Sequence, residues 1–186
     1  MARTRILLDS NSYFRLAQNL HPLLFNEFGE EKFTLFVHAD LNWEFKRSSR
    51  LRSKFDWVMD EEFVENRKRS LRIKKDEKEP IEMTHAYIWE HVREGNLGPS
   101  DIDVQILATA AVLEIMVVTD DADMIAVADM YGIHWISSLE LIKMMLDHDH
   151  ITMENVSRVV DQWRYDKDLP NKHFEKDFER IFGSPE

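Results

Sequence analysis

The side chains in this sequence that are best suited to chemistry are carboxylates placed directly after apolar runs. An apolar run that ends at Val118 leads, after one threonine, into three carboxylates, Asp120, Asp121 and Asp123. The first apolar run of the chain ends in the same way, at Asp9. Because like charges at such spacing repel one another unless a cation or solvent separates them, the pattern indicates a cation site or a solvated turn.

These acids belong at one edge of a parallel sheet if the apolar runs are buried strands. Continuous apolar runs are typical of strands covered on both faces, and ligands bind at the carboxyl ends of such strands. If the strands before Asp9 and Asp120 are neighbours, their tips lie about 5–10 Å apart. Glu44 follows the second expected strand, and Asp103 lies in the first turn of the helix before the third. We therefore expect four carboxylate sites to converge on one crevice.

A crevice of this composition would select a hard cation. The chain has no cysteine, and no histidine stands at ligand spacing among these acids. Clustered carboxylates then favour Mg²⁺ or Mn²⁺. Each acid also has a purely structural alternative: Asp9 and Asp121 as helix caps, Asp103 as the capping partner of Ser100, and Glu44 as a surface helix residue.

Alternating strands and helices must position these residues, which predicts an α/β fold with three layers, α/β/α, and a parallel sheet of four to five strands. The expected strands are 5–9, 33–37, 115–119 and 134–137. The expected helices are 13–28, 40–52, 55–79, 81–94, 101–113, 122–131, 139–146, 152–163 and 172–182, with Pro80 ending or kinking the third. We predict one domain over 1–150 with a helical, partly basic insertion at about 50–99, and a helical extension over 151–186 packed on it.

The charge of the chain is unevenly distributed. The net charge is −11, yet residues 46–75 hold eleven of the 24 basic residues and only five acids. A segregated basic segment on an acidic body indicates nucleic-acid binding, with a solvated helix face as the alternative. The candidate phosphate contacts are Arg47, Arg50, Arg67, Lys68, Arg69, Arg72, Lys74 and Lys75. With no apolar run long enough to span a bilayer and no signal-peptide pattern, we expect a cytoplasmic protein.

Several motifs, in order, resemble those of PIN-domain nucleases. The opening strand followed by Asp9-Ser10-Asn11 is similar to the start of that family, and Phe36–Phe45 is similar to the unit that carries its glutamate. The stretch from Asp103 to Ala110 resembles its Asp-x-x-Ile-x-Ala-Thr-Ala helix. The stretch from Val117 to Met124 resembles its Thr-Asn-Asp-x-Asp-Phe turn, with aspartate for asparagine at position 120. The resemblance covers about 5–49 and 100–146.

The resemblance implies a metal-dependent endoribonuclease similar to the VapC toxins of toxin–antitoxin modules. The implied catalytic and metal-binding acids are Asp9, Glu44, Asp103 and Asp121, with Asp123 as a further metal ligand; which acid of the turn binds directly stays open. Ser10, Asn11, Thr119 and Asp120 would orient those ligands. The alternatives are a structure-specific DNase on the same fold and an inactive nucleic-acid-binding module.

The expected partners are an RNA substrate, a cognate antitoxin protein and a second copy of the chain. The last expectation rests on apolar side chains near the end of the sequence, which exceed what the sheet needs for cover. These are Trp163, Phe174, Phe178, Ile181 and Phe182. We expect them to form a dimer interface or an antitoxin groove.

Overall fold

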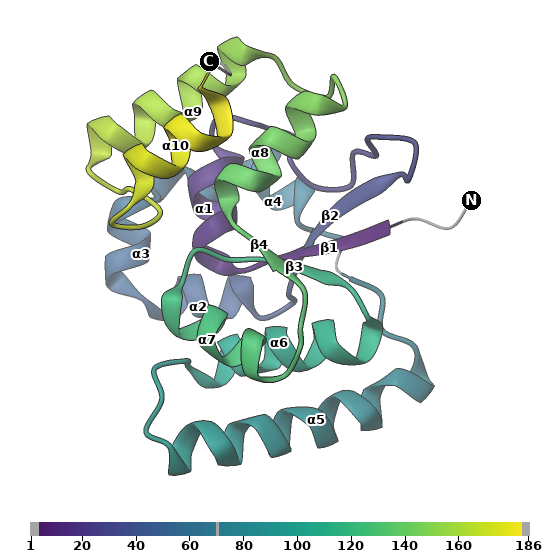
Figure 1. Ribbon diagram of the computed structural model, residues 1–186. Helices are drawn as coiled ribbons and strands as arrows, with labels where there is room; N and C mark the ends of the chain where they lie inside the picture. The colour runs from purple at the N-terminus through teal and green to yellow at the C-terminus, as the bar shows by residue number, and fades with distance from the viewer. Residues whose placement is uncertain (1–3, 70, 184–186) are drawn as a thin grey trace.

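A four-stranded parallel sheet lies at the centre of the computed structural model, which describes residues 4–69 and 71–183 (Figure 1). The strands are β1 (Thr4–Leu8), β2 (Phe33–Val37), β3 (Met116–Val118) and β4 (Trp135–Ile136). Their order is β2-β1-β3-β4, and every neighbouring pair is parallel. The predicted α/β architecture is confirmed, with four strands in the described part of the chain.

The register of the strands brings their carboxyl ends to one edge. Leu8 pairs with Val37 on one side and with Val118 on the other, and Val118 pairs with Ile136. The backbone amide of Asp9 then donates to the carbonyl of Val118 at 3.0 Å. The residues that follow β1 and β3 therefore leave the sheet side by side.

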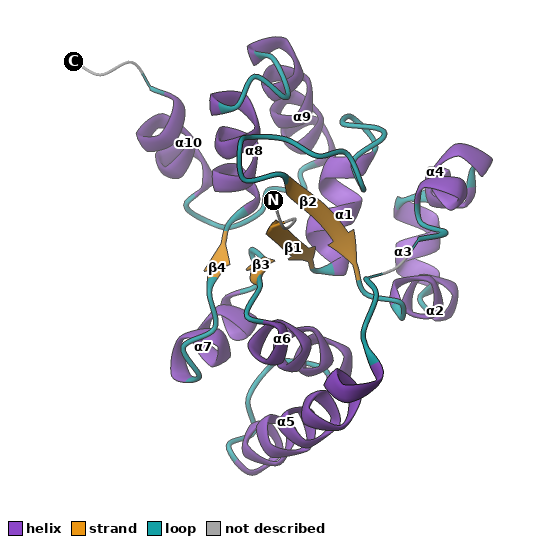
Figure 2. Ribbon diagram, turned by 90° about the vertical axis from the view of Figure 1, so that its right-hand side faces the viewer, coloured by secondary structure: helices purple, strands orange, loops and turns teal. Residues whose placement is uncertain are grey.

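Helices cover both faces of the sheet (Figures 1 and 2). One face carries α1 (Ser10–Ala17), α8 (Ser138–Asp147), α9 (Met153–Asp166) and α10 (Phe174–Phe182). The other carries α5 (Lys75–Glu94), α6 (Asp101–Leu113) and α7 (Ala122–Met130). Beyond the β2 edge lie the short elements α2 (Leu41–Arg47), α3 (Ser49–Lys54), η1 (Asp56–Met59) and α4 (Glu61–Asn66).

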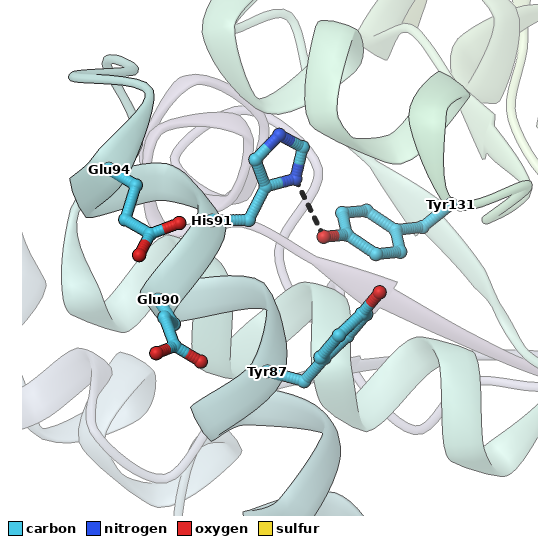
Figure 3. Close-up of a pocket in the computed structure, with 5 residues that line it drawn as sticks. All are labelled: Tyr87, Glu90, His91, Glu94 and Tyr131. Carbon is cyan, nitrogen blue, oxygen red and sulfur yellow. Dashed lines mark hydrogen bonds between the residues drawn. The ribbon is translucent and has the colours of Figure 1, made fainter.

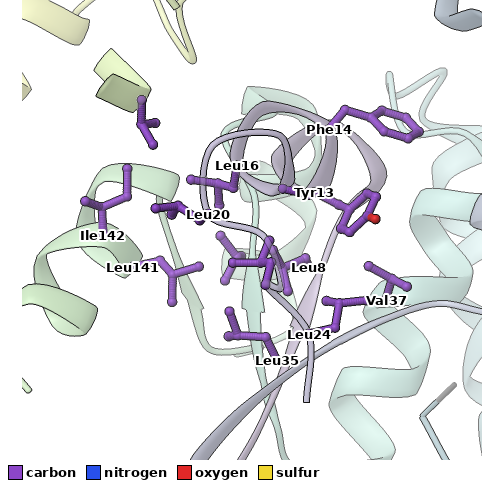
Figure 4. Close-up of a cluster of buried hydrophobic side chains, with 14 of the residues drawn as sticks. Leu8, Tyr13, Phe14, Leu16, Leu20, Leu24, Leu35, Val37, Leu141 and Ile142 are labelled. Carbon is purple, nitrogen blue, oxygen red and sulfur yellow. The ribbon is translucent and has the colours of Figure 1, made fainter. Parts of the chain in front are cut away.

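Two apolar clusters, one on each face, hold these layers together. Alternation along β1 sends Ile6 and Leu8 into the first cluster and Leu7 into the second. Figure 4 shows the first cluster, in which Tyr13 and Phe14 of α1 and Ile142 of α8 pack around the strands. Because these side chains are almost fully buried, the sheet edge that follows β1 and β3 rests on rigid elements.

Two of the predicted helices have clearly different limits in the structure. The helix expected over 13–28 begins earlier, because Asp9 caps α1, and it ends at Ala17. The helix expected over 40–52 is two helices, since the hydroxyl of Ser48 accepts from the amide of Leu51 and starts α3 anew. The Asp9 cap is the structural alternative given for that residue, whereas apolar spacing did not reveal the Ser48 cap.

The prediction of one charged helix over 55–79 is wrong. The chain forms η1 and α4 and then leaves the helical conformation before α5 begins at Lys75. Arg67 ends α4 by turning inward to hydrogen-bond the carbonyl of Val58. The crowding of like charges just after it also disfavours a helix, because cations three and four residues apart repel.

Pro80 does not end a helix, which was one of the two predicted effects, since it lies inside α5. It is the sixth residue of that helix, so only the carbonyl of Asp76 loses its intrahelical partner. Both residues are exposed, which leaves that carbonyl open to water. The helix ends at Glu94, as predicted.

The C-terminal helix packs on the molecule to which it belongs. Trp163 and Phe174 are buried, so their prediction as surface side chains is wrong. Phe178, Ile181 and Phe182 are partly buried against the first cluster. None of the helices within 4–69 and 71–183 is long and apolar enough to cross a lipid bilayer.

Candidate functional site

Asp9 is the most deeply buried acid at the carboxyl edge of the sheet. Its Oδ1 accepts from the Ser12 amide and its Oδ2 from the Thr119 hydroxyl, both at 2.6 Å. Burial raises the pKa of Asp9 to about 6, although these hydrogen bonds hold it down in part. The nearby charge of Asp120 raises it further. The capping role of Asp9 is real, and it leaves neither carboxylate oxygen without a protein donor.

Thr119 joins the two acidic turns. Its hydroxyl donates to Asp9 and accepts from the amide of Asp121 at 3.1 Å. The side chain is fully buried, so its orientation is fixed. Thr119 therefore holds Asp9 beside the turn that follows β3.

Glu44 comes to the same edge from α2. The hydroxyl of Ser10 donates to its Oε2 at 2.5 Å, which ties α2 to the residue after Asp9. Burial raises the pKa of Glu44, the Ser10 hydrogen bond lowers it, and the charge of Asp103 raises it. Glu44 is thus neither a free surface residue nor far from the acid of α6.

Asp103 stands in the first turn of α6 and completes a capping box with Ser100. Its Oδ2 accepts from the Ser100 amide at 2.8 Å, and its own amide donates to the Ser100 hydroxyl. Burial is the largest influence and raises the pKa of Asp103, and the charge of Asp121 raises it too. Electrostatic contact therefore runs from Glu44 to Asp103 and on to Asp121.

Three of these acids keep one carboxylate oxygen without a partner in the described part of the chain. Glu44 uses only Oε2, Asp103 uses only Oδ2, and Asp121 uses only Oδ1, which caps α7 through the amides of Asp123 and Met124. Three oxygens from three elements are hard ligands of the kind that Mg²⁺ and Mn²⁺ bind. The donor set fits such an ion in its chemistry.

The side chains are not drawn together into a finished cage. Among residues 4–69 and 71–183, no three acidic or histidine side chains lie close enough to hold one metal ion. The acids are instead linked in pairs by the hydrogen bonds and charges described above. The elements that carry the four predicted acids therefore meet at one edge, without a ready-made metal cage among the described residues.

Asp120 turns away from this group. Its two oxygens accept from the backbone amide and the hydroxyl of Ser138 at 3.0 and 2.5 Å, at the start of α8. Arg15 lies 3.8 Å from it. Burial raises the pKa of Asp120, and the Ser138 hydrogen bonds oppose that rise. Of the acids after β3, Asp120 thus serves the packing of α8.

Asp123 and Asn11 are exposed. A Cβ at Gly98 would lie 1.9 Å from the Oδ2 of Asp123 and 2.8 Å from its Cβ, so only glycine fits beside this acid. Gly98 lies in the loop Gly95–Pro99 between α5 and α6, and no role was predicted for it from the sequence. Asn11 makes no side-chain hydrogen bond to the described residues, so the orienting role predicted for it has no contact to support it.

Arg67 is a correction to the predicted set of phosphate contacts. It is only 5% exposed, and its guanidinium donates to the Tyr13 hydroxyl, to the Val58 carbonyl and to Asn42. A buried guanidinium that is hydrogen-bonded within the core cannot reach a phosphate. The other members of the set are exposed: Arg47, Arg50, Lys68, Arg69, Arg72, Lys74 and Lys75.

A hollow of about 470 Å³ lies elsewhere, between the outer side of α5 and the end of α7 (Figure 3). His91 and the hydroxyl of Tyr131 meet there at 2.7 Å, beside Tyr87. Tyr131 follows the last residue of α7, whereas Asp121 caps its first turn, about 14 Å away along a nine-residue helix. This hollow is therefore separate from the acids.

Comparison with known proteins gives little to set beside this geometry. No protein-family model matches the chain, and no curated protein sequence matches it. A chain from the crystal structure of FitAcB from Neisseria gonorrhoeae is similar in structure, with a TM-score of 0.46 and 17% sequence identity. The match covers 72% of this chain and 97% of that one.

Proposed function

We propose that the protein is a metal-dependent endoribonuclease of the PIN-domain type, with Glu44, Asp103 and Asp121 as the residues that hold Mg²⁺ or Mn²⁺. The observation that carries the proposal is that these three acids, from three elements at one sheet edge, each keep an unpartnered carboxylate oxygen. A divalent ion bound there supplies a Lewis acid and a water of lowered pKa. The order of the motifs in the sequence supports the same class.

The residues of the chain itself prepare this site. Ser10 fixes the direction of Glu44, and Ser100 fixes that of Asp103, so each acid presents its other oxygen without losing its orientation. Asp9, held by Thr119, would contribute negative charge from beneath the site. Because the pKa values of Glu44 and Asp103 are raised by burial and by neighbouring acids, a cation would stabilise their charged forms.

The test is cleavage of a single-stranded RNA with Mg²⁺, Mn²⁺ or EDTA. Wild type should cleave with either ion and not with EDTA. Glu44→Gln, Asp103→Asn and Asp121→Asn should each lower turnover by at least about a hundredfold, since even losses of supporting residues at metal sites cost 10–100-fold. Mn²⁺ binding followed by electron paramagnetic resonance should weaken in the same variants, which gives a readout apart from turnover.

Asp101→Asn is the matched control. Asp101 lies in the same first turn of α6 but is exposed and pairs with His85 at 3.1 Å, away from Glu44. Its variant should keep wild-type turnover. Wild-type cleavage in EDTA, or full activity in Asp103→Asn, would contradict the proposal. A single-stranded DNA of the same sequence, run in parallel, separates a ribonuclease from a DNase, and binding without cleavage would indicate an inactive module.

We further propose that such a nuclease is the toxin of a toxin–antitoxin module acting in the cytoplasm. This part rests on the resemblance of the sequence motifs to VapC-like toxins. Growth arrest on expression of wild type, relieved by Asp103→Asn, is the expected result. Unimpaired growth on expression of an RNA-cleaving wild type would contradict the toxin assignment alone.

A further inference from the structure

A basic groove lies against the β1–β2 side of the sheet. It is a hollow of about 840 Å³, within the usual size of ligand pockets. Four cationic side chains line it, together with two aromatic rings: Arg5, Arg69, Arg72, Lys74, Phe25 and Phe36. None of the described residues that line it is acidic, in a chain whose net charge is −11.

The cations of the basic groove are largely free of counter-charges. In the described part of the chain, no ion pair joins Arg5, Arg69 or Arg72 to an acid, and Lys74 has only Glu77 at 3.7 Å. Arg69 lies over the ring of Phe25, with its guanidinium carbon 5.7 Å from the ring centroid. Uncompensated cations held at one hollow repel one another, so an anion is the ligand that would stabilise them.

The basic groove also leads toward the acids. A smaller hollow of about 230 Å³ shares Arg69 with it and is also lined by Leu41 and Asn42. Those two residues begin α2, the helix that carries Glu44. A ligand that follows the cations from Arg5 past Arg69 thus arrives at the element that supplies the first candidate metal ligand.

From this arrangement we infer that the basic groove binds single-stranded nucleic acid and guides it to the acidic site. Cations that track a backbone beside aromatic rings are the features that bind single strands. The hollow, at about 840 Å³, has room for a few linked nucleotides. The guiding role rests on the proposed function, because the bound single strand would be the substrate that the acids cut.

The test is binding of a fluorescein-labelled, ten-nucleotide single-stranded RNA to the wild-type protein in EDTA, followed by fluorescence anisotropy. The triple variant Arg5→Gln, Arg72→Gln, Lys74→Gln should bind at least tenfold more weakly at 100 mM salt. The slope of log K against log salt should fall by about 2, from roughly 0.7 per lost phosphate contact. The exposed pair Arg72→Gln, Lys74→Gln should lower it by about 1.4.

The matched control removes the same charge elsewhere. Lys78, Arg93 and Lys176 are exposed and lie outside the basic groove, so their triple Gln variant should bind within twofold of wild type with an unchanged slope. The double variant Arg5→Lys, Arg72→Lys, which keeps both positive charges, should retain most of the wild-type affinity. Thermal melting of each variant verifies that it is folded.

Three results would overturn the inference: equal losses in both triple variants, tighter binding of a duplex RNA of the same length, or displacement of the RNA by polyglutamate as readily as by unlabelled RNA. The last would make an acidic polypeptide the better occupant. Since binding is measured without metal, its outcome is independent of cleavage. A protein that binds but does not cut would refute only the proposed function.

Discussion

Asp9 shows how a single buried carboxylate affects the whole fold. It is fully enclosed, caps α1 and accepts from Thr119, yet burial raises its pKa to about 6. An ordinary aspartate has a pKa near 3.8. Folding therefore takes up a proton between about pH 4 and pH 6, and stability falls as pH rises through that window.

Neutralising this residue should stabilise the protein most where Asp9 is charged. We expect Asp9→Asn to raise the free energy of unfolding by about 2 kcal/mol more at pH 7.5 than at pH 4.5, from the size of the pKa shift. Urea denaturation at the two pH values measures the difference. A gain of equal size at both, or a loss at pH 7.5, would contradict this account of Asp9.

At the scale of elements, the loop Gly95–Pro99 approaches α7 so closely that Gly98 lies against Asp123. A methyl group at Gly98 would meet both the carboxylate and the Cβ of Asp123, so rotating the acid cannot make room. Gly98→Ala should cost about 1–3 kcal/mol, as overpacking does. Asp123→Gly, which removes the Cβ together with the carboxylate, should remove most of that cost, giving a coupling of at least about 1 kcal/mol in a double-mutant cycle. Additive effects would mean that the two elements do not touch in solution.

The same scale shows what could be predicted from the sequence. The four strands and the helices around the acids were predicted because apolar runs and the Ser100 cap leave clear patterns. The segment after α4 was not, because its course depends on Arg67 entering a core built from residues far away. The acids of the site were predicted, but the orientations of their side chains were not. Nothing in the neighbouring sequence shows that Asp120 faces Ser138 while Asp121 faces α6.

At the scale of the whole molecule, the C-terminal helix closes the first apolar cluster. Phe174 is 1% exposed and lies against Trp163, with ring centroids 5.8 Å apart. Phe174→Ala should cost about 3–5 kcal/mol of unfolding free energy, the usual loss for a buried phenylalanine. Phe182→Ala, at a partly buried position of the same helix, should cost clearly less in the same urea titration. Equal and small losses would mean that α10 is not part of the folded core.

The acids of the candidate site also cap helices, and this affects how the molecule would respond to a ligand. Asp9, Asp103 and Asp121 each accept from backbone amides at the beginning of a helix. A cation on the unpartnered oxygen of Asp103 or Asp121 would weaken those amide bonds, because the two oxygens of a carboxylate share one negative charge. Ligand binding and the local order of α6 and α7 are thus thermodynamically linked. The first turns of these two helices are the part of the backbone whose stability should change when the site binds a ligand.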